Sequence, residues 1–336
     1  MVRTDVIGDL TSLGLLNQRA RILVVGDGNF SYSRALMRAN SARIKASEIN
    51  VTVTSLDAES QLVKMYPNSR AILDELRSSG INIRHGVDAT KLESLSFKND
   101  TQRNKFDRVV FNFPHYVANG GGNKNISNKI HRHRQLLVAF FASASQVLTR
   151  DGQIWVTLCA GQGGTKLEMK PRTEGNTWQI IQCAAAAKLV LQDAHFFPME
   201  ALTALGYYSV GYQSREKAFW TEGGITHVFC HEARGHKSCF PITWRRGISF
   251  WITDEALFTQ DRLVDVLHEH FPLETMDLAI SLLDEYRCKN SGRKSVTYRL
   301  DISSPVMALS RERINALVQT ALYAIDSSEF GACRTT

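Results

Sequence analysis

The chain has 336 residues, 43% of them hydrophobic and 22% charged, as in an ordinary globular protein with room for one large and one small domain. No apolar run reaches the ~18 residues of a membrane-spanning helix, and the first residues lack a basic-then-apolar signal pattern, which argues against export. The net charge of +7 is uneven: residues 1–239 hold 29 Lys and Arg against 20 Asp and Glu, and residues 240–336 hold 11 against 13. The basic first part would attract phosphates, although a solvated basic surface explains the charge equally well.

The first part of the chain alternates predicted strands with predicted helices, which is the pattern of a parallel sheet covered by helices. Apolar runs predict strands over residues 22–26, 50–56, 81–87, 107–113, 153–159, 207–213 and 225–231. Helices are predicted over residues 32–46, 67–79, 131–149 and 178–189. We therefore expect an α/β, Rossmann-like domain over residues 1–235.

A second, smaller domain is predicted after a polar segment without periodicity, residues 232–238, which we interpret as a linker. Strands are predicted over residues 247–254, 277–287 and 295–304, and helices over residues 256–271 and 310–325. Ser310 is a suitable N-cap for the last helix. We expect an α+β domain over residues 240–336 with a mostly antiparallel sheet.

The six cysteines include no CxxC pair, and we interpret them as small buried residues. The cluster that spacing could connect with zinc is Cys230, His231, His236 and Cys239. We expect no metal.

A Gly-rich turn, GDGNFS, follows the first apolar strand and predicts a cofactor site. Small residues in this turn let the backbone pass close to a ligand. The acids at the ends of the next two strands, Asp57 and Asp88, could meet the ribose hydroxyls and the adenine amino group. Asp27 would attract a sulfonium and repel a pyrophosphate, and G-x-G-x-x-G is absent, which favours S-adenosylmethionine (SAM) over a nicotinamide cofactor. The predicted cofactor residues are Gly26, Asp27, Gly28, Asn29, Phe30, Ser31, Asp57 and Asp88.

A second short string, FNFPHY, ends the predicted strand 107–113 and supplies the candidate catalytic residues. Asn112 offers a carbonyl acceptor and an amide donor, and Pro114 stiffens the backbone beside it. Such a tip could hold the edge of a flat base, with Phe113 or Tyr116 stacking on it. If the acceptor is N3 of uracil, its proton must leave, and His115 is the nearby group that titrates near neutral pH. His115 could equally cap the turn or bind phosphate.

A basic segment follows this tip and could grip the phosphates on either side of an unpaired or flipped base. The candidate RNA-binding residues are Lys124, Lys129, Arg132 and Arg134. A solvated loop leading into a helix is the alternative interpretation for each of them.

Two family resemblances rest on these and further strings. VVGDGNFSYSRAL, TSLDAES, HGVDATKL, FDRVVFNFPHY and TWQIIQCAAAAKLVLQDAHFF, within residues 20–231, resemble the large-subunit rRNA uridine-N3 methyltransferase-like family. This resemblance implies a SAM-binding fold and an rRNA substrate. FPITWRRGISFWI, SVTYRLDISS and ALSRERINALVQTAL are similar to the ferredoxin-fold anticodon-binding domain of phenylalanyl-tRNA synthetases. The combination is the pattern of ferredoxin-fold anticodon-binding domain-containing proteins, and it implies a ferredoxin-like second domain.

The leading hypothesis is a SAM-dependent RNA base methyltransferase, acting on uridine N3 in rRNA. A tRNA substrate is the rival that the second domain raises, and a non-catalytic RNA-binding or assembly factor is the alternative from another class. The four residues Gly26, Gly28, Asp57 and Asp88 favour the enzyme because a decayed site would have lost some of them. We expect the protein in the cytoplasm or nucleolus.

Overall fold

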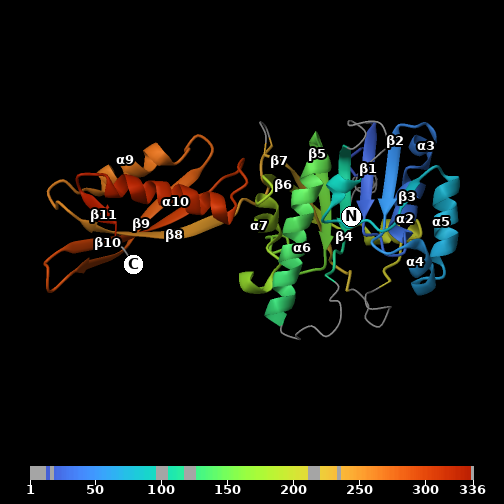
Figure 1. The fold of residues 1–336 in the computed structure, drawn as a ribbon, viewed down its shortest axis with the longest axis horizontal. Helices are drawn as coiled ribbons and strands as arrows, with labels where there is room; N and C mark the ends of the chain where they lie inside the picture. Colours follow the sequence, from blue (N-terminus) through green and yellow to red (C-terminus); the bar gives the residue numbers. More distant parts are fainter. Residues whose placement is uncertain are drawn as a thin grey trace. The chain divides into compact units, whose positions relative to one another are not determined.

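The computed structural model describes residues 13–15, 19–95, 105–116, 126–210, 220–232 and 236–333, with the side chains of residues 126–128 left aside. Contacts between residues divide the chain into two units, Met1–His231 and Glu232–Thr336 (Figure 1). The division falls at the start of the segment that the sequence predicts to be a linker. Among the described residues, no helix has the length and apolar character needed to cross a membrane.

Within the described part of the first unit, seven strands form one sheet in the order β3-β2-β1-β4-β5-β7-β6. The strands are β1 (Ala20–Val25), β2 (Ile49–Thr54), β3 (Asn82–Arg84), β4 (Phe106–Asn112), β5 (Leu148–Leu158), β6 (Leu189–Phe196) and β7 (Ile225–His231). The first five strands of the chain are parallel, and β7 runs antiparallel to both β5 and β6. The strand order reverses at β1, between β2 and β4, and a sheet of this kind binds its ligand beyond the carboxyl ends of the strands at such a point.

Helices cover the sheet of the first unit (Figure 1). They are α2 (Ser31–Ala39), α3 (Ser41–Lys45), α4 (Glu59–Met65), α5 (Ser69–Ser78), α6 (Ile126–Val147), α7 (Ile180–Ala185) and α8 (Met199–Ala204), with 3-10 turns η1 (Leu92–Ser94) and η3 (Glu174–Asn176). α5 buries Ile72, Leu73 and Leu76, which share one face of the helix and pack in the same core as Val24 of β1. α2 contacts both α5 and α8, whereas α6 contacts α7 and η1. The two groups of helices hold the sheet, and therefore its carboxyl edge, in place.

Three predicted elements of this unit are wrong in part. The helix predicted over residues 32–46 is two helices, because the backbone and side-chain amides of Asn40 both donate to the Leu36 carbonyl and close α2. The helix predicted over residues 178–189 ends at Ala185, and after Lys188 (φ 57°) the chain turns into β6, which the prediction omits. Of the strand predicted over residues 207–213, residues 207–210 have no regular structure, and residues 211–213 lie outside the described part.

The described residues of the second unit build a four-stranded antiparallel sheet in the order β11-β8-β10-β9. The elements are β8 (Thr243–Ile252), α9 (Gln260–His270), β9 (Asp277–Arg287), β10 (Lys294–Ser303), α10 (Arg311–Asp326) and β11 (Gly331–Cys333). Apolar residues of both helices, such as Leu263 and Ile314, share one core with Phe250 and Leu300 of the sheet. Ser310 caps α10, as the sequence predicts, because its Oγ accepts a hydrogen bond from the Arg313 amide at 3.1 Å. The ferredoxin-like assignment of this unit stays a prediction.

Candidate functional site

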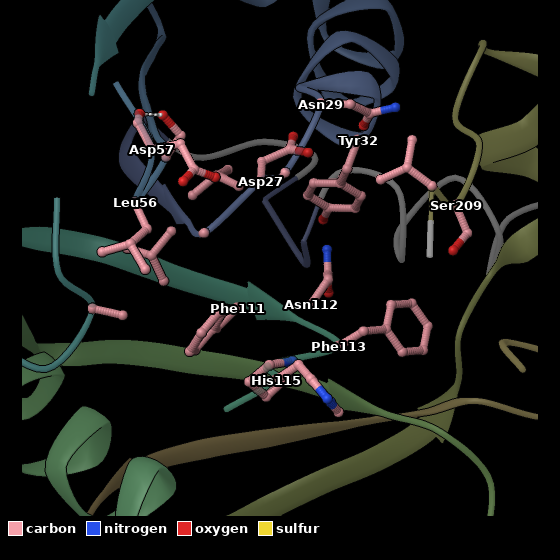
Figure 2. A pocket seen from close by; sticks show the side chains of 18 of the residues that line it. Asp27, Asn29, Tyr32, Leu56, Asp57, Phe111, Asn112, Phe113, His115 and Ser209 are labelled. Atoms are coloured by element: carbon pink, nitrogen blue, oxygen red, sulfur yellow. Dashed lines mark hydrogen bonds between the residues drawn. The ribbon is translucent and has the colours of Figure 1, made fainter. Parts of the chain in front are cut away.

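A cavity of about 420 Å³ opens at the carboxyl ends of β1, β2 and β4, where the strand order reverses (Figure 2). Five segments provide most of its lining, namely residues 24–29, 55–57, 87–89, 111–115 and 207–210. The first four follow from the topology, because the carboxyl ends of parallel strands meet at one edge of the sheet. The cavity therefore brings together the Gly-rich turn, the two acids and the Asn-x-Pro-His tip.

The Gly-rich turn can form only with glycine at its first position. Gly26 has φ of 65°, and a Cβ on it would lie 2.7 Å from Cε2 of Phe111. The next residue, Asp27, accepts hydrogen bonds at Oδ2 from the amide (2.8 Å) and the hydroxyl (2.6 Å) of Ser33. Burial raises the pKa of Asp27, and the hydrogen bonds from Ser33 oppose that rise. Asp27 lines the cavity, but one of its oxygens is committed to the start of α2.

Two residues predicted to contact the cofactor, Phe30 and Ser31, do not line the cavity. Phe30 is fully buried with φ of 61°, and its ring meets His85 edge-on at 5.6 Å. Ser31 Oγ lies 2.8 Å from Asn29 Oδ1 and 2.9 Å from the carbonyl of Tyr208. Both residues stand at the start of α2, where Phe30 belongs to the core and Ser31 fastens the wall formed by residues 207–210, so their contact with the cofactor stays a prediction.

The acids after β2 and β3 both line the cavity. Asp57 stands three residues beyond the end of β2, and its carboxylate makes no hydrogen bond or ion pair with the described residues. Asp88 accepts hydrogen bonds at Oδ1 from the amide (2.9 Å) and hydroxyl (2.7 Å) of Thr90. Leu56, Met65 and Val87 add apolar surface between these acids. A carboxylate beside apolar walls suits a ribose and an adenine ring, so the cavity fits the nucleoside part of SAM.

The tip of β4 forms the opposite wall, where Asn112, Phe113 and His115 line the cavity together (Figure 2). Asn112 Oδ1 accepts a hydrogen bond from the hydroxyl of Thr157 at 2.7 Å, and this hydroxyl lies 3.0 Å from that of Thr226. The amide nitrogen of Asn112 points toward the hydroxyl of Tyr32 (Figure 2). The carbonyl of this amide is therefore held on the sheet side, and its NH₂ nitrogen, which points toward Tyr32, is buried.

The residues on either side of Pro114 differ in how they are held. Phe113 has φ of 48°, donates its amide to the Thr157 carbonyl at 2.8 Å, and meets the Phe197 ring edge-on at 5.3 Å. Pro114 is buried and lines the cavity. His115 is half-buried, and burial, reinforced by the neighbouring His133 and Lys129, lowers its pKa to about 4. The imidazole of His115 is therefore neutral at neutral pH.

Of the four candidate RNA-binding residues, Lys124 lies outside the described part of the chain. Lys129 is exposed at the start of α6, and the guanidinium of Arg132 lies 5.3 Å from the centre of the Tyr116 ring. Arg134 donates to the carbonyls of three residues in the turn around η3: Glu174, Gly175 and Thr177. Backbone carbonyls thus hold two of the guanidinium nitrogens of Arg134, Nε and Nη2, against this turn, and its contact with RNA stays a prediction. Tyr116 does not line the cavity, so Phe113 is the aromatic residue of the tip that a base would meet.

Sequence reasoning missed two parts of the site. The wall at residues 207–210 includes Tyr207, whose side chain is buried beside Tyr32. Tyr207 and Tyr208 are the available signal, but they lie within the run that predicts a strand over residues 207–213. The second omission is His133 of α6, which stacks on Trp178 behind His115. No sequence signal connects these residues, because only the tertiary fold brings them together.

The family model described as rRNA (uridine-N3-)-methyltransferase BTM5-like matches residues 23–209. The chain is 36% identical over 285 residues to a mouse ferredoxin-fold anticodon-binding domain-containing protein 1 homolog, covering 78% of this chain and 43% of the relative. It is 35% identical over 209 residues to the human ferredoxin-fold anticodon-binding domain-containing protein 1, covering 62% of this chain and 30% of the relative. The chain thus spans less than half the length of these two relatives.

Similar solved structures include TrmN from Thermus thermophilus, with a TM-score of 0.38, 13% identity, and coverage of 67% of this chain and 48% of that chain. Another is a TehB-like SAM-dependent methyltransferase from Corynebacterium glutamicum, with a TM-score of 0.35, 15% identity, and coverage of 67% and 86%.

Proposed function

This chain belongs to the BMT5-like family of rRNA (uridine-N3-)-methyltransferases, and from that membership we propose that it methylates N3 of a uridine in RNA, with rRNA as the substrate. SAM is the cofactor of this family, and when bound it supplies an electrophilic methyl group. The observation that carries the proposal is the meeting of the Gly-rich turn and the β4 tip in one cavity. A cofactor at the turn and a base at the tip would share that cavity.

At the cofactor end, Asp57 is the residue that binds the ribose. Its carboxylate lines the cavity and has no competing partner among the described side chains. Asp88 is held by Thr90 at one oxygen and bounds the adenine side of the apolar slot. Asp27 shapes the turn because its buried carboxylate accepts two hydrogen bonds from Ser33 in the first turn of α2. These bonds tie the Gly-rich turn to the helix.

At the base end, the fixed orientation of Asn112 favours uracil. The hydroxyl of Thr157 occupies Oδ1, so the buried NH₂ group is the part of the amide left to donate to a base. Uracil carries a carbonyl oxygen on each side of N3, and both oxygens are acceptors. Cytosine carries an amino donor on one side, which would face the NH₂ group of Asn112 without a hydrogen bond.

His115 receives the proton that leaves N3. Its imidazole is neutral at neutral pH, so an unprotonated ring nitrogen can accept the proton as the new N–C bond forms. Phe113 contacts the face of the base, and the buried Pro114 holds both neighbours in position. The target nucleotide must be unpaired or flipped to reach this tip.

RNA outside the cavity would meet the basic first part of the chain, through Lys129 and Arg132 among the described residues. The second unit has the element order β-α-β-β-α-β, which supports a ferredoxin-fold anticodon-binding domain. We propose that this domain contacts RNA or a protein partner, and that the protein works in the nucleolus or cytoplasm, where rRNA is found.

Transfer of a labelled methyl group from SAM to purified rRNA and tRNA tests the proposal. Wild-type protein should label rRNA, and His115→Ala should lose at least about 100-fold in rate, since a positioned base contributes about 10²–10⁴-fold. Asp74→Ala, which alters an exposed acid of α5, is the matched control and should retain full activity. A wild-type protein that binds SAM and labels none of these RNAs would contradict the proposal.

A further inference from the structure

The buried histidine His133 of α6 stands directly behind His115 and outside the cavity lining. Its ring stacks on the indole of Trp178, with the ring centres 4.2 Å apart and the planes 18° apart. Both of its ring nitrogens are engaged. Nδ1 lies 2.7 Å from the carbonyl oxygen of Lys129, and Nε2 lies 3.2 Å from Nδ1 of His115. His133 is therefore held on its face and on both polar edges.

These contacts fix the position of each ring proton. A backbone carbonyl only accepts hydrogen bonds, so Nδ1 of His133 must carry its proton toward Lys129. In a neutral ring the other nitrogen, Nε2, is then an acceptor. The hydrogen bond at 3.2 Å must therefore be donated by Nδ1 of His115. It follows that Nε2 of His115 carries no proton and is the basic atom of that ring.

The charged alternative is disfavoured by the surroundings of the pair. A proton on Nε2 of His133 would reverse the hydrogen bond between the rings and would require an imidazolium in a buried position. Burial lowers the pKa of His133, the carbonyl of Lys129 opposes this, and the Lys129 ammonium lowers the pKa further. Both rings are thus neutral at neutral pH.

We propose that His133 is a positioning residue that selects the tautomer of His115 in which Nε2 is the proton acceptor. The inference rests on the proposed function in one respect, namely that this Nε2 receives the proton from N3 of uracil. In that step the N3–H bond breaks and the proton moves to Nε2. The electron pair left on N3 forms the bond to the methyl carbon, and the carbon–sulfur pair returns to sulfur. Nδ1 of His115 keeps its proton and its hydrogen bond to His133 throughout.

The positioning is specific because it opposes the ordinary preference of histidine. In water a neutral imidazole side chain favours the tautomer with the proton on Nε2. In that tautomer Nε2 of His115 would face the nucleobase as a hydrogen-bond donor and could not accept its proton. The Lys129–His133–His115 chain of hydrogen bonds enforces the other tautomer, and the stack on Trp178 keeps the His133 ring from rotating out of line.

Long-range ¹H–¹⁵N correlation spectra of the full chain labelled at histidine test this directly, because they distinguish protonated from unprotonated ring nitrogens. His115 is assigned by the loss of its signals in His115→Asn. At pH 7 the wild-type protein should show His115 protonated at Nδ1 and unprotonated at Nε2. A wild-type His115 protonated at Nε2 would overturn the inference, and this measurement requires no variant of His133 to fold.

His133→Phe keeps an aromatic ring against Trp178 and removes both nitrogens. We expect the His115 signals to shift toward the Nε2-protonated tautomer and kcat to fall about 10- to 100-fold, part of the contribution of a positioned base, with SAM affinity unchanged. His268→Phe, at an exposed histidine of α9, is the control and should change neither the His115 signals nor kcat. A folded His133→Phe protein with the wild-type tautomer would overturn the inference. The predicted tautomer in a protein that methylates no RNA would instead uphold the positioning of His115 and overturn the proposed function.

Discussion

Replacing Asp57 with alanine should weaken SAM binding without loosening the fold. The carboxylate lines the cavity and makes no hydrogen bond or ion pair within the described part of the chain, whereas its backbone carbonyl accepts the hydroxyl of Ser55 at 2.8 Å and keeps the loop in place. A hydrogen bond to a charged group contributes about 1.5–3 kcal/mol. The carboxylate is half-exposed, so each of its two hydrogen bonds to ribose hydroxyls should contribute the lower end of that range. The total is about 3 kcal/mol, which corresponds to a roughly 150-fold increase in the Kd for SAM.

Isothermal titration calorimetry on the wild type, Asp57→Ala and Asp57→Asn measures this effect. The asparagine variant keeps the shape and one acceptor oxygen, so we expect an intermediate loss of about tenfold, equivalent to ~1.4 kcal/mol. Asp74→Ala is the control, and urea unfolding of all variants should stay within about 0.5 kcal/mol of the wild type. If Asp57→Ala binds SAM within threefold of a micromolar wild type, the carboxylate does not hold the ribose and the assignment of the cofactor end is wrong.

Three further predictions concern the turn, the tip and the core. Gly26→Ala places a Cβ 2.7 Å from Cε2 of Phe111, at a residue with a left-handed φ. The free energy of unfolding measured in urea should therefore fall by about 2–4 kcal/mol. An unchanged unfolding midpoint would contradict the geometry. Thr157→Val removes the hydroxyl that holds the Asn112 amide and frees the amide to rotate. The preference for uridine over cytidine in a methyl-transfer assay should then fall about fivefold, as expected for the loss of ~1 kcal/mol. An unchanged ratio would show that this hydroxyl does not set the orientation of the amide. Burial lowers the pKa of His227 to about 4. As the pH falls, His227 therefore takes up a proton in the unfolded chain before it does so in the folded chain. The free energy of unfolding that His227 contributes above pH 6.5 is lost as the pH falls toward 4. Between pH 7 and pH 5 the loss should be roughly 2 kcal/mol, and His227→Gln should remove that part of the slope in urea unfolding measured across this range.

The sequence was sufficient to predict that the Gly-rich turn and the β4 tip lie in one cavity. Their strands are both parallel and apolar, and the carboxyl ends of adjacent parallel strands share an edge. The same reasoning located Asp57 and Asp88, because each follows a strand of that sheet. The roles assigned to these residues stay predictions.

Tertiary packing decided what local sequence patterns could not. Phe30 and Ser31 belong to the turn by sequence, but the start of α2 carries them away from the cavity. Residues 207–210 have the aromatic composition of a strand, yet Tyr208 is fastened to Ser31 from a segment 177 residues away. His133 contacts His115 although the two residues are 18 positions apart in the chain, and no local sequence pattern predicts this contact.

The most direct test of the proposed reaction is the identity of the methylated nucleoside. Wild-type protein is incubated with SAM and rRNA, the RNA is digested to nucleosides, and the methylated product is identified by mass spectrometry against synthetic standards. We expect 3-methyluridine, formed by the wild type and lost in His115→Ala. A methylated cytidine or adenosine would contradict the role of Asn112 as a donor to uracil, and the absence of any methylated nucleoside would contradict the proposed reaction itself.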